Sequence, residues 1–288
     1  MTMFHTQRKI FQLQVGSRLV GFVCAFGLAV TTAHVSAAPK AMDEKTIKQI
    51  EQRILNDLKS GPWLQEQIEL GIKNHAKKEK EAQVAARAEF MRQAAEKAKS
   101  VRPVDQARDH IYGKPDAPLS LIEYSDFECP YCKQFHAIPK ALVDASDGQL
   151  NWVYRHFPLR FHNPAAQKAA EASECANELG GQKAFWAFTD GAYARTQSNG
   201  KGFDPMPLVK ELGLAEVEFQ KCLDSGKFAA HVNQDLEEGV KSGITGTPGT
   251  ILRNNRTGEV RLKPGMVPEA ALKTDMEQML APHPTPKK

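Results

Sequence analysis

Cys129 and Cys132 form a Cys-Pro-Tyr-Cys motif that follows an apolar run, residues 119–124, and precedes a helical pattern. A cysteine at a helix N-terminus meets unpaired backbone N–H groups and the positive end of the helix dipole, and both favour the thiolate. The thiolate is the nucleophile of disulfide exchange. Cys132, one turn further along, can attack the mixed disulfide and release the partner. The motif therefore predicts thiol–disulfide chemistry with Cys129 as the nucleophile.

The same two cysteines are also compatible with half of a metal site. Such a site needs a second pair of ligands, and the chain has no second Cys-x-x-Cys and no His-x-x-x-His. His136 follows Cys132 by four residues on the same helix face, so a partial site of Cys129, Cys132 and His136 stays open as an alternative. We expect redox chemistry, with no cofactor and no resident metal.

A carboxylate stands in the middle of the apolar strand that leads to the motif. Glu123 lies six residues before Cys129, and a buried carboxylate is costly unless it has a partner or a task. Burial would raise its pKa and let it exchange a proton with the thiol of Cys132. The alternative is an edge position at which the carboxylate lies in water.

The first residues predict export. Arg8, Lys9 and Arg18 precede an apolar run, residues 19–30, which small residues follow. This is the pattern of a cleaved signal peptide, and the run is too short to span a membrane comfortably. We expect a signal peptide over residues 1–37, with an uncleaved anchor as the alternative. Its removal takes away three basic side chains and no acid, which changes the formal net charge from +4 to +1 and excludes a nucleic-acid footprint.

The exported chain would keep four of its five cysteines. We expect it to work in the periplasm, a compartment in which disulfides form. Cys175 and Cys222 both lie in a region with a helical pattern. They are expected to form a structural disulfide between helices, and two free buried thiols are the alternative. Closing a loop of this length would stabilise the fold by about 4 kcal/mol on the chain-entropy model.

Residues 43–100 differ from everything after them, within a composition that is otherwise that of a globular protein, 41% hydrophobic and 25% charged. The segment is rich in Lys, Glu, Gln and Ala, and its apolar residues, such as Ile47, Ile50 and Ile54, are spaced by three and four. Such helices bury too little surface to be stable alone. The segment therefore either packs against copies of itself or is a partly disordered spacer.

The remaining chain alternates between strand and helix patterns. Residues 101–118 carry several helix breakers and are predicted to be a linker. Strands are expected at 119–124 and 150–157, helices between 164 and 242, and a hairpin at 253–262. A block of helices between strands predicts an α/β domain with a helical insertion. The Thr247–Pro248 bond, flanked by glycines at the entry of a strand, is a candidate for a cis peptide.

Together these segments resemble the DsbA-like branch of the thioredoxin superfamily. The resemblance spans about residues 111–280 and rests on EYSDFECPYCKQFH, AAEASECANELGGQKAFWAFTDGAYA, FQKCLDSGKFAA and GITGTPGTIL. It implies that Cys129 is the exposed nucleophile, Cys132 the resolving cysteine and Glu123 the buried acid. It also implies that Thr247 and Pro248 form a cis-proline loop that docks extended substrates, and it supports a bridge between the second pair of cysteines.

Two departures from the family pattern bear on activity. Tyr131 stands where the strongest oxidants of the family carry His, so Cys129 should be less acidic and the disulfide less oxidising. We assign Tyr131 to the substrate-binding surface together with Thr247 and Pro248. Thr before the cis-proline is typical of the disulfide isomerases, and residues 38–100 are similar to the oligomerisation arms of the isomerase and suppressor-of-copper-sensitivity branches.

The sequence therefore predicts an α/β protein, a thioredoxin fold with a helical insertion preceded by an N-terminal α-helical arm. The expected activity is that of a periplasmic thiol–disulfide oxidoreductase, with isomerisation favoured over simple oxidation. The alternatives are a monofunctional dithiol oxidase and a periplasmic copper- or zinc-binding protein that uses the same cysteines. Expected partners are misfolded or reduced exported proteins, a membrane redox partner and further copies of the chain in a dimer or trimer, but no nucleic acid.

The expected organisation has five parts. These are a signal peptide (1–37), a helical oligomerisation arm (38–100), a linker (101–118), a DsbA-like thioredoxin domain (119–282) with its insertion over about 163–242, and a disordered tail (283–288).

Overall fold

The computed structural model of the protein describes residues 43–281, so the expected signal peptide and tail lie outside the described residues. The chain divides into two compact units, and the boundary between them falls after Gly71. That boundary lies inside a helix, well before residue 100, at which the helical arm is predicted to end.

The first unit consists of α1 (Glu44–Ser60) and the start of α2 (Pro62–Ala98). Asp43 caps α1, because its carboxylate accepts a hydrogen bond from the backbone N–H of Thr46 at 2.8 Å. No residue of α1 is buried, and its apolar stripe is exposed at Ile47, Ile50 and Ile54. The stripe that the sequence predicts is therefore exposed among the described residues.

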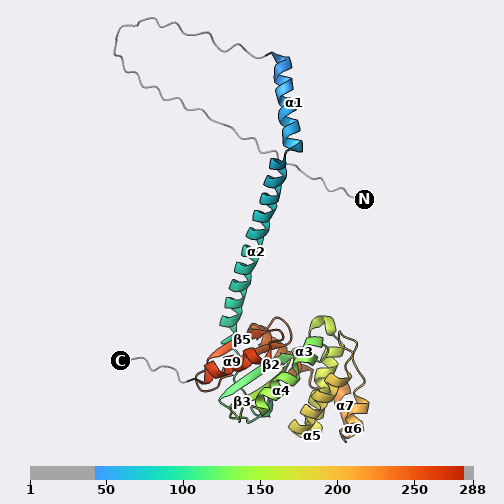
Figure 1. The fold of residues 1–288 in the computed structure, drawn as a ribbon. Coiled ribbons are helices and arrows are strands. Elements are labelled where there is room, and N and C mark those ends of the chain that lie inside the picture. The colour runs from blue at the N-terminus through green and yellow to red at the C-terminus, as the bar shows by residue number, and fades with distance from the viewer. Residues whose placement is uncertain (1–42, 282–288) are drawn as a thin grey trace, which may run out of the picture. The chain divides into compact units, whose positions relative to one another are not determined.

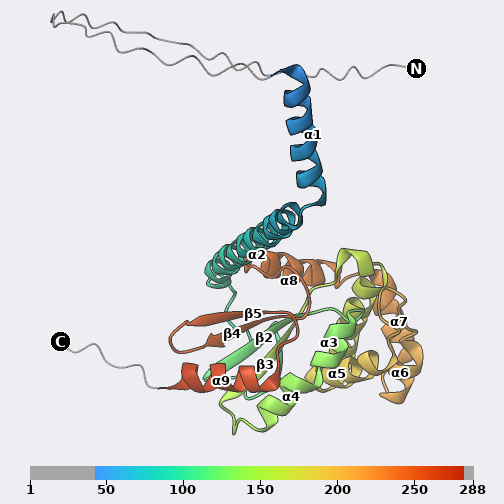
Figure 2. The same ribbon diagram turned by 45° about the horizontal axis from the view of Figure 1, so that its top comes forward.

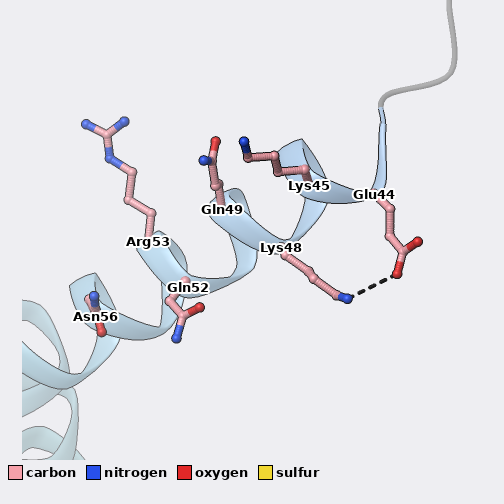
Figure 3. Close-up of a pocket in the computed structure, with 7 residues that line it drawn as sticks. All are labelled: Glu44, Lys45, Lys48, Gln49, Gln52, Arg53 and Asn56. Carbon is pink, nitrogen blue, oxygen red and sulfur yellow. Dashed lines mark hydrogen bonds and ion pairs between the residues drawn. The ribbon is translucent and has the colours of Figure 1, made fainter.

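The other side of α1 is polar. Lys48 and Glu44 form an exposed ion pair at 3.1 Å on this side. Such an exposed pair adds little to the stability of the helix. Figure 3 shows the seven side chains around a shallow hollow here: Glu44, Lys45, Lys48, Gln49, Gln52, Arg53 and Asn56. These long, exposed side chains form the solvated face of an amphipathic helix.

The second unit is built on a five-stranded mixed sheet with the order β1-β3-β2-β4-β5. The strands are β1 (His110–Gly113), β2 (Leu119–Ser125), β3 (Leu150–His156), β4 (Gly249–Asn254) and β5 (Val260–Pro264). The β2–β3 pair is parallel and the other pairs are antiparallel. Every residue of β2 and β3 is buried, because helices lie on both sides of the sheet (Figures 1 and 2).

Side-chain alternation along the strands divides the core into two clusters. Leu121 and Trp152 belong to one cluster, whereas Ile122 and Val153, their neighbours in sequence, belong to the other. The second cluster also includes Ala98, at the end of α2. The last turns of α2 are thus part of the domain core rather than of a separate arm.

The end of α2 also lies directly against the loop that precedes β4. Gly243 in this loop has a φ of +82°, and a Cβ on it would come within 2.7 Å of the carbonyl oxygen of Ala94. The close approach requires glycine.

Residues 101–118 are not the linker that the sequence predicts. Strand β1 occupies their centre and pairs antiparallel with β3, with His110 opposite Tyr154. Val101 and Asp109 are buried. The edge strand β1 forms because it pairs with a segment about forty residues away. The helix breakers in this region, such as Pro103, give no sign of that pairing.

Seven α-helices and one short 3-10 helix (Arg160–His162) follow β2 in the described part of the second unit. The α-helices are α3 (Pro130–Phe135), α4 (Ala137–Asp144), α5 (Ala165–Arg195), α6 (Met206–Glu211), α7 (Glu216–Ser225), α8 (Ala229–Lys241) and α9 (Glu269–Leu280). Helices α5 to α8 are inserted between β3 and β4. The predicted fold class, a thioredoxin fold with a helical insertion after an α-helical segment, is confirmed.

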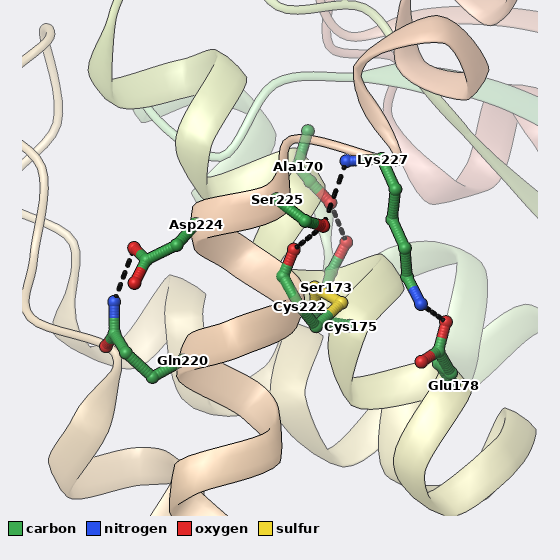
Figure 4. Close-up of a disulfide and its surroundings, with 9 residues drawn as sticks. All are labelled: Ala170, Ser173, Cys175, Glu178, Gln220, Cys222, Asp224, Ser225 and Lys227. Atoms are coloured by element: carbon green, nitrogen blue, oxygen red, sulfur yellow. Dashed lines mark hydrogen bonds and ion pairs between the residues drawn. A yellow bond between two sulfur atoms is a disulfide. The ribbon is translucent and has the colours of Figure 1, made fainter.

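A disulfide between Cys175 and Cys222 joins α5 to α7 within the insertion (Figure 4). The two cysteines are 47 residues apart in sequence and their Cα atoms are 5.9 Å apart. Both are buried, and an ion pair between Lys227 and Glu178 lies beside them. The bond closes a long loop of the unfolded chain.

Replacing Cys175 and Cys222 by serine should lower the free energy of unfolding by about 4 kcal/mol, because the unfolded chain regains the entropy of the open loop. The measurement is urea unfolding followed by circular dichroism, with Cys129 and Cys132 oxidised in all samples. Ser225→Ala, which removes two hydrogen bonds next to the disulfide, one to the carbonyl oxygen of Cys222 and one from the backbone N–H of Lys227, is the control and should cost about 1–2 kcal/mol. Equal losses in the two variants would contradict the loop argument.

Candidate active site

The turn between β2 and α3 places Cys129. The carboxylate of Asp126 accepts hydrogen bonds from the backbone N–H groups of Glu128 at 2.7 Å and Leu159 at 2.9 Å. The carbonyl oxygen of Asp126 accepts from the N–H of Cys129 at 3.0 Å. Cys129 is the N-cap residue of α3, and Pro130 occupies the first helical position, where its missing N–H has no partner to lose.

The environment of Cys129 favours its thiolate. A hydrogen bond from the thiol of Cys132 lowers the pKa of Cys129 to about 6 despite the opposing effect of burial. Hydrogen bonds from the backbone N–H groups of Cys132 and Tyr131 act in the same direction. At neutral pH Cys129 is therefore largely ionised and nucleophilic.

Cys132 has the opposite character. Its side chain is 0% exposed, and burial, together with the charges of Glu123 and Cys129, raises the pKa of its thiol well above the ordinary value. Both cysteines are free thiols in the structure. Two cysteines one helical turn apart thus differ in acidity, as a nucleophile and a resolving thiol must.

Glu123 is buried in β2, a central strand between β3 and β4, which excludes the edge position considered above. Its carboxylate accepts hydrogen bonds from Ser125 Oγ at 2.6 Å and Trp152 Nε1 at 3.0 Å. Burial raises its pKa to about 7, although both hydrogen bonds oppose the rise. Near neutral pH the group can therefore accept or release a proton.

Ser125, Trp152 and Tyr193 complete this buried network and are absent from the sequence-based prediction. Ser125 Oγ lies 2.8 Å from the hydroxyl of Tyr193, which is 3.0 Å from that of Tyr154. Ser125 follows Glu123 by two residues and so lies on the same face of β2. That spacing could have identified Ser125, but Tyr193 comes from α5 and no local pattern points to it.

The loop before β4 faces Cys129. The Thr247–Pro248 peptide bond is cis, and Cys129 Sγ lies 3.4 Å from the carbonyl oxygen of Thr247. The register places Gly249 opposite Tyr124, which brings the start of β4 next to the end of β2. A second cis bond, Asn163–Pro164, is absent from the sequence-based prediction.

The two remaining candidates lie on α3 and at its end. Tyr131 is 59% exposed and lies two residues after Cys129 in the chain. His136 Nε2 lies 2.7 Å from a carboxylate oxygen of Asp190. Among residues 43–281, the side chains that converge in a metal-binding arrangement do not include Cys129, Cys132 or His136.

The raised pKa of Glu123 determines how its contribution to stability changes with pH. Below about pH 4.5 the carboxyl is protonated in both the folded and the unfolded chain, and its stabilising contribution is fully present. As the pH rises to about 7, the unfolded chain releases this proton first, so the contribution is lost. The loss at higher pH amounts to about 3 kcal/mol.

Glu123→Gln should therefore be more stable relative to the wild type near pH 8 than near pH 4, by about 3 kcal/mol. The amide can still accept from Trp152 and donate to Ser125. Urea unfolding at the two pH values measures the difference, with Asp147→Asn, at an exposed position, as the control. A difference between Glu123→Gln and wild type that does not change with pH would show that folding does not raise the pKa of this carboxyl.

Comparisons with known proteins agree with this geometry. Residues 105–263 match a protein-family model described as Thioredoxin. The crystal structure of DsbA2 from Pseudomonas aeruginosa is 32% identical with a TM-score of 0.55, and the match covers 62% of this chain and 97% of that chain. Oxidised BdbD from Bacillus subtilis shares the fold at 23% identity, with a TM-score of 0.52 and 61% and 95% covered.

Curated relatives are similar over about half of the chain. The Na(+)/H(+) antiporter NhaA 3 of Salinispora tropica is 37% identical over 155 residues, which are 54% of this chain and 23% of the antiporter. NhaA of Herminiimonas arsenicoxydans is 36% identical over 154 residues, 54% of this chain and 24% of that protein. The chain thus spans about a quarter of the length of these relatives.

No helix among residues 43–281 has the length and hydropathy to cross a membrane. The family match contains the whole sheet except the last residue of β5, together with the cysteine pair and the helical insertion. The chain belongs to the thioredoxin family, in its DsbA-like branch.

Proposed function

We propose that the protein is an exported thiol–disulfide oxidoreductase that acts on the disulfides of other exported proteins in the periplasm, with isomerisation favoured over simple oxidation. The observation that carries the proposal is the opposite acidity of the two cysteines, a pKa lowered to about 6 for Cys129 and raised for Cys132. Only a dithiol with one ionised and one protonated sulfur is ready both to attack a disulfide and to resolve the product.

In the proposed reaction the thiolate of Cys129 attacks one sulfur of a client disulfide. The client S–S bond breaks, its second sulfur leaves as a thiolate, and a mixed disulfide forms. That client thiolate can attack another disulfide of the client, and a client thiolate then displaces Cys129, so the client is rearranged without net oxidation. Alternatively Cys132 gives its proton to Glu123 and attacks Cys129, which releases a reduced client and leaves the Cys129–Cys132 disulfide.

The loop at Thr247 and Pro248 is the proposed docking surface for the client. The Thr247 carbonyl lies next to the nucleophile, where an extended segment could pair with the backbone. An apolar groove continues from the loop toward α2, lined by Phe90, Met91, Ala94, Ile244 and Leu262, among others. Tyr131 would border the client on the side of α3.

The preference for isomerisation rests on Tyr131 and on the arm. A phenol beside the thiolate lends it less positive charge than an imidazolium would, so the disulfide should be only moderately oxidising. The uncovered stripe of Ile47, Ile50 and Ile54 would pair copies of the chain in a dimer or trimer. Several active sites around one client raise the effective concentration for repeated attack.

The glutathione equilibrium of the Cys129–Cys132 pair tests the activity. We expect a disulfide that forms reversibly with a moderate reduction potential, and Tyr131→His should make it more oxidising and lower the pKa of Cys129 further. Tyr131→Phe, which keeps the ring without a charge, is the matched control. A strongly oxidising wild type that Tyr131→His does not change would favour the oxidase alternative, kept oxidised by a membrane partner. Failure to form the disulfide would favour metal binding by the cysteines.

Deletion of residues 43–71 tests the role of the arm. Residues 72–98 must be kept, because Ala94 and Ala98 are buried against the domain. The truncated protein should be monomeric by light scattering and lose disulfide isomerisation by about tenfold or more, while it still reduces a small disulfide at the wild-type rate.

Point variants of α1 distinguish the loss of pairing between copies of the chain from an effect of shortening the chain. Ile50→Glu places a charge in the apolar stripe and should act like the deletion, whereas Gln49→Glu places it on the polar face and should have no effect. Undiminished isomerisation by a monomeric truncated protein would contradict the proposed role of the arm.

A further inference from the structure

A second cluster of titratable side chains lies outside the cysteine site. His110 of β1, His156 of β3, Glu174 of α5 and His231 of α8 meet around a single carboxylate oxygen. Glu174 Oε1 lies 2.7 Å from His110 Nε2, 2.7 Å from His156 Nε2 and 3.5 Å from His231 Nε2. The three imidazole centroids are 6.3, 6.3 and 6.5 Å apart. The rings therefore surround the oxygen on three sides.

Among residues 43–281, hydrogen bonding to Glu174 accounts for only two of these three imidazoles. A carboxylate oxygen has two lone pairs, and the short contacts of His110 and His156 use both. His231 Nε2 lies 3.5 Å from Glu174 and 3.8 Å from a carboxylate oxygen of Asp235, longer than an ordinary hydrogen bond to either. Within the described residues, His231 Nε2 therefore lies in a polar cluster without a free acceptor. The Glu174 oxygen already accepts two hydrogen bonds, and the Asp235 oxygen is too distant.

We propose that this cluster binds a divalent transition-metal ion of the zinc type, held by His110 Nε2, His231 Nε2 and a carboxylate oxygen of Glu174, with His156 Nε2 as a fourth donor. Imidazole and carboxylate ligands suit zinc and its neighbours in the first transition row.

The distances among the first three donors agree with such a site, and the contact of His156 Nε2 with Glu174 Oε1 at 2.7 Å is the reason for its place as the fourth donor. The donor atoms of His110, Glu174 and His231 all lie within 4.8 Å of one another. Zinc bonds of about 2.0–2.1 Å place tetrahedral ligand atoms about 3.3 Å apart. Changes of about an ångström in side-chain position would bring the observed separations to that value. His231 is able to make such a movement, because its side chain is 22% exposed, and the same exposure gives an ion a way in.

The surroundings bear on the strength of the site. Arg108, a cation that acts on His231, forms an ion pair with Asp235 at 2.7 Å, so its charge is balanced by a carboxylate. The Nδ1 atoms of His110 and His156 lack hydrogen-bond partners within the described part of the chain, whereas ligating imidazoles usually donate this second N–H to an acceptor. We therefore expect a weaker site than one with both partners.

The ion would connect four elements that are far apart in sequence, namely edge strand β1, strand β3 and helices α5 and α8. The expected consequence is that zinc holds the helical insertion against the sheet. The cysteine pair takes no part in this binding, so the proposed redox function and the proposed metal site can fail independently.

Isothermal titration of the full chain with Zn²⁺ tests the proposal, after chelator treatment and with Cys129 and Cys132 oxidised so that they cannot bind metal. We expect one ion per chain and a rise in Tm. His231→Ala should weaken binding by about tenfold or more, whereas His75→Ala, which removes an exposed histidine of α2, should not. Both variants should have wild-type melting curves without zinc.

X-ray absorption of the zinc-loaded wild type provides a readout that needs no variant. Nitrogen and oxygen ligands with the multiple-scattering signature of two or three imidazoles are expected. Absence of binding at millimolar Zn²⁺, equal affinity in His231→Ala and wild type, or sulfur ligands in the absorption spectrum would each overturn the proposal.

Discussion

The active site depends on the burial of one carboxyl and one thiol beneath the first turn of a helix. Glu123 and Cys132 are almost completely removed from water, and this raises the pKa of both groups. With its proton retained, Cys132 can donate a hydrogen bond to Cys129 above it and so favour the thiolate there. The acidity of Cys129 is thus a consequence of the apolar packing of β2 and β3, two strands without an exposed residue.

The part of the fold that short-range patterns determine was predictable from sequence. The strand that leads into Cys129, the helix that Pro130 begins and the helical insertion all have local signals, and the family resemblance connects them. Strand β1 has no such signal, because its four residues are a strand only through pairing with β3. Gly71 suggests a break in α2, but a single glycine costs a helix only about 1 kcal/mol, and the helix continues through it.

The candidate site also has residues that the sequence identifies and residues that only the tertiary structure brings together. Cys129, Cys132 and Glu123 lie within ten residues of one another, so their spacing alone suggests joint chemistry. Trp152 meets Glu123 because β3 pairs with β2, and Tyr193 meets Ser125 because α5 packs on the sheet. The histidines around Glu174 come from three different elements and share no motif. Groups of this kind become visible only when the tertiary contacts are known.

The unequal acidity of the two cysteines also determines how electrons and protons are coupled. Above about pH 6 the reduced pair holds a thiolate at Cys129 and a thiol at Cys132, so two electrons enter the disulfide with only one proton. The reduction potential of the pair then falls by about 30 mV for each unit of pH, half the slope of an ordinary dithiol. Acidification of the surroundings would therefore shift this protein's redox balance only half as far as that of dithiols that take up two protons.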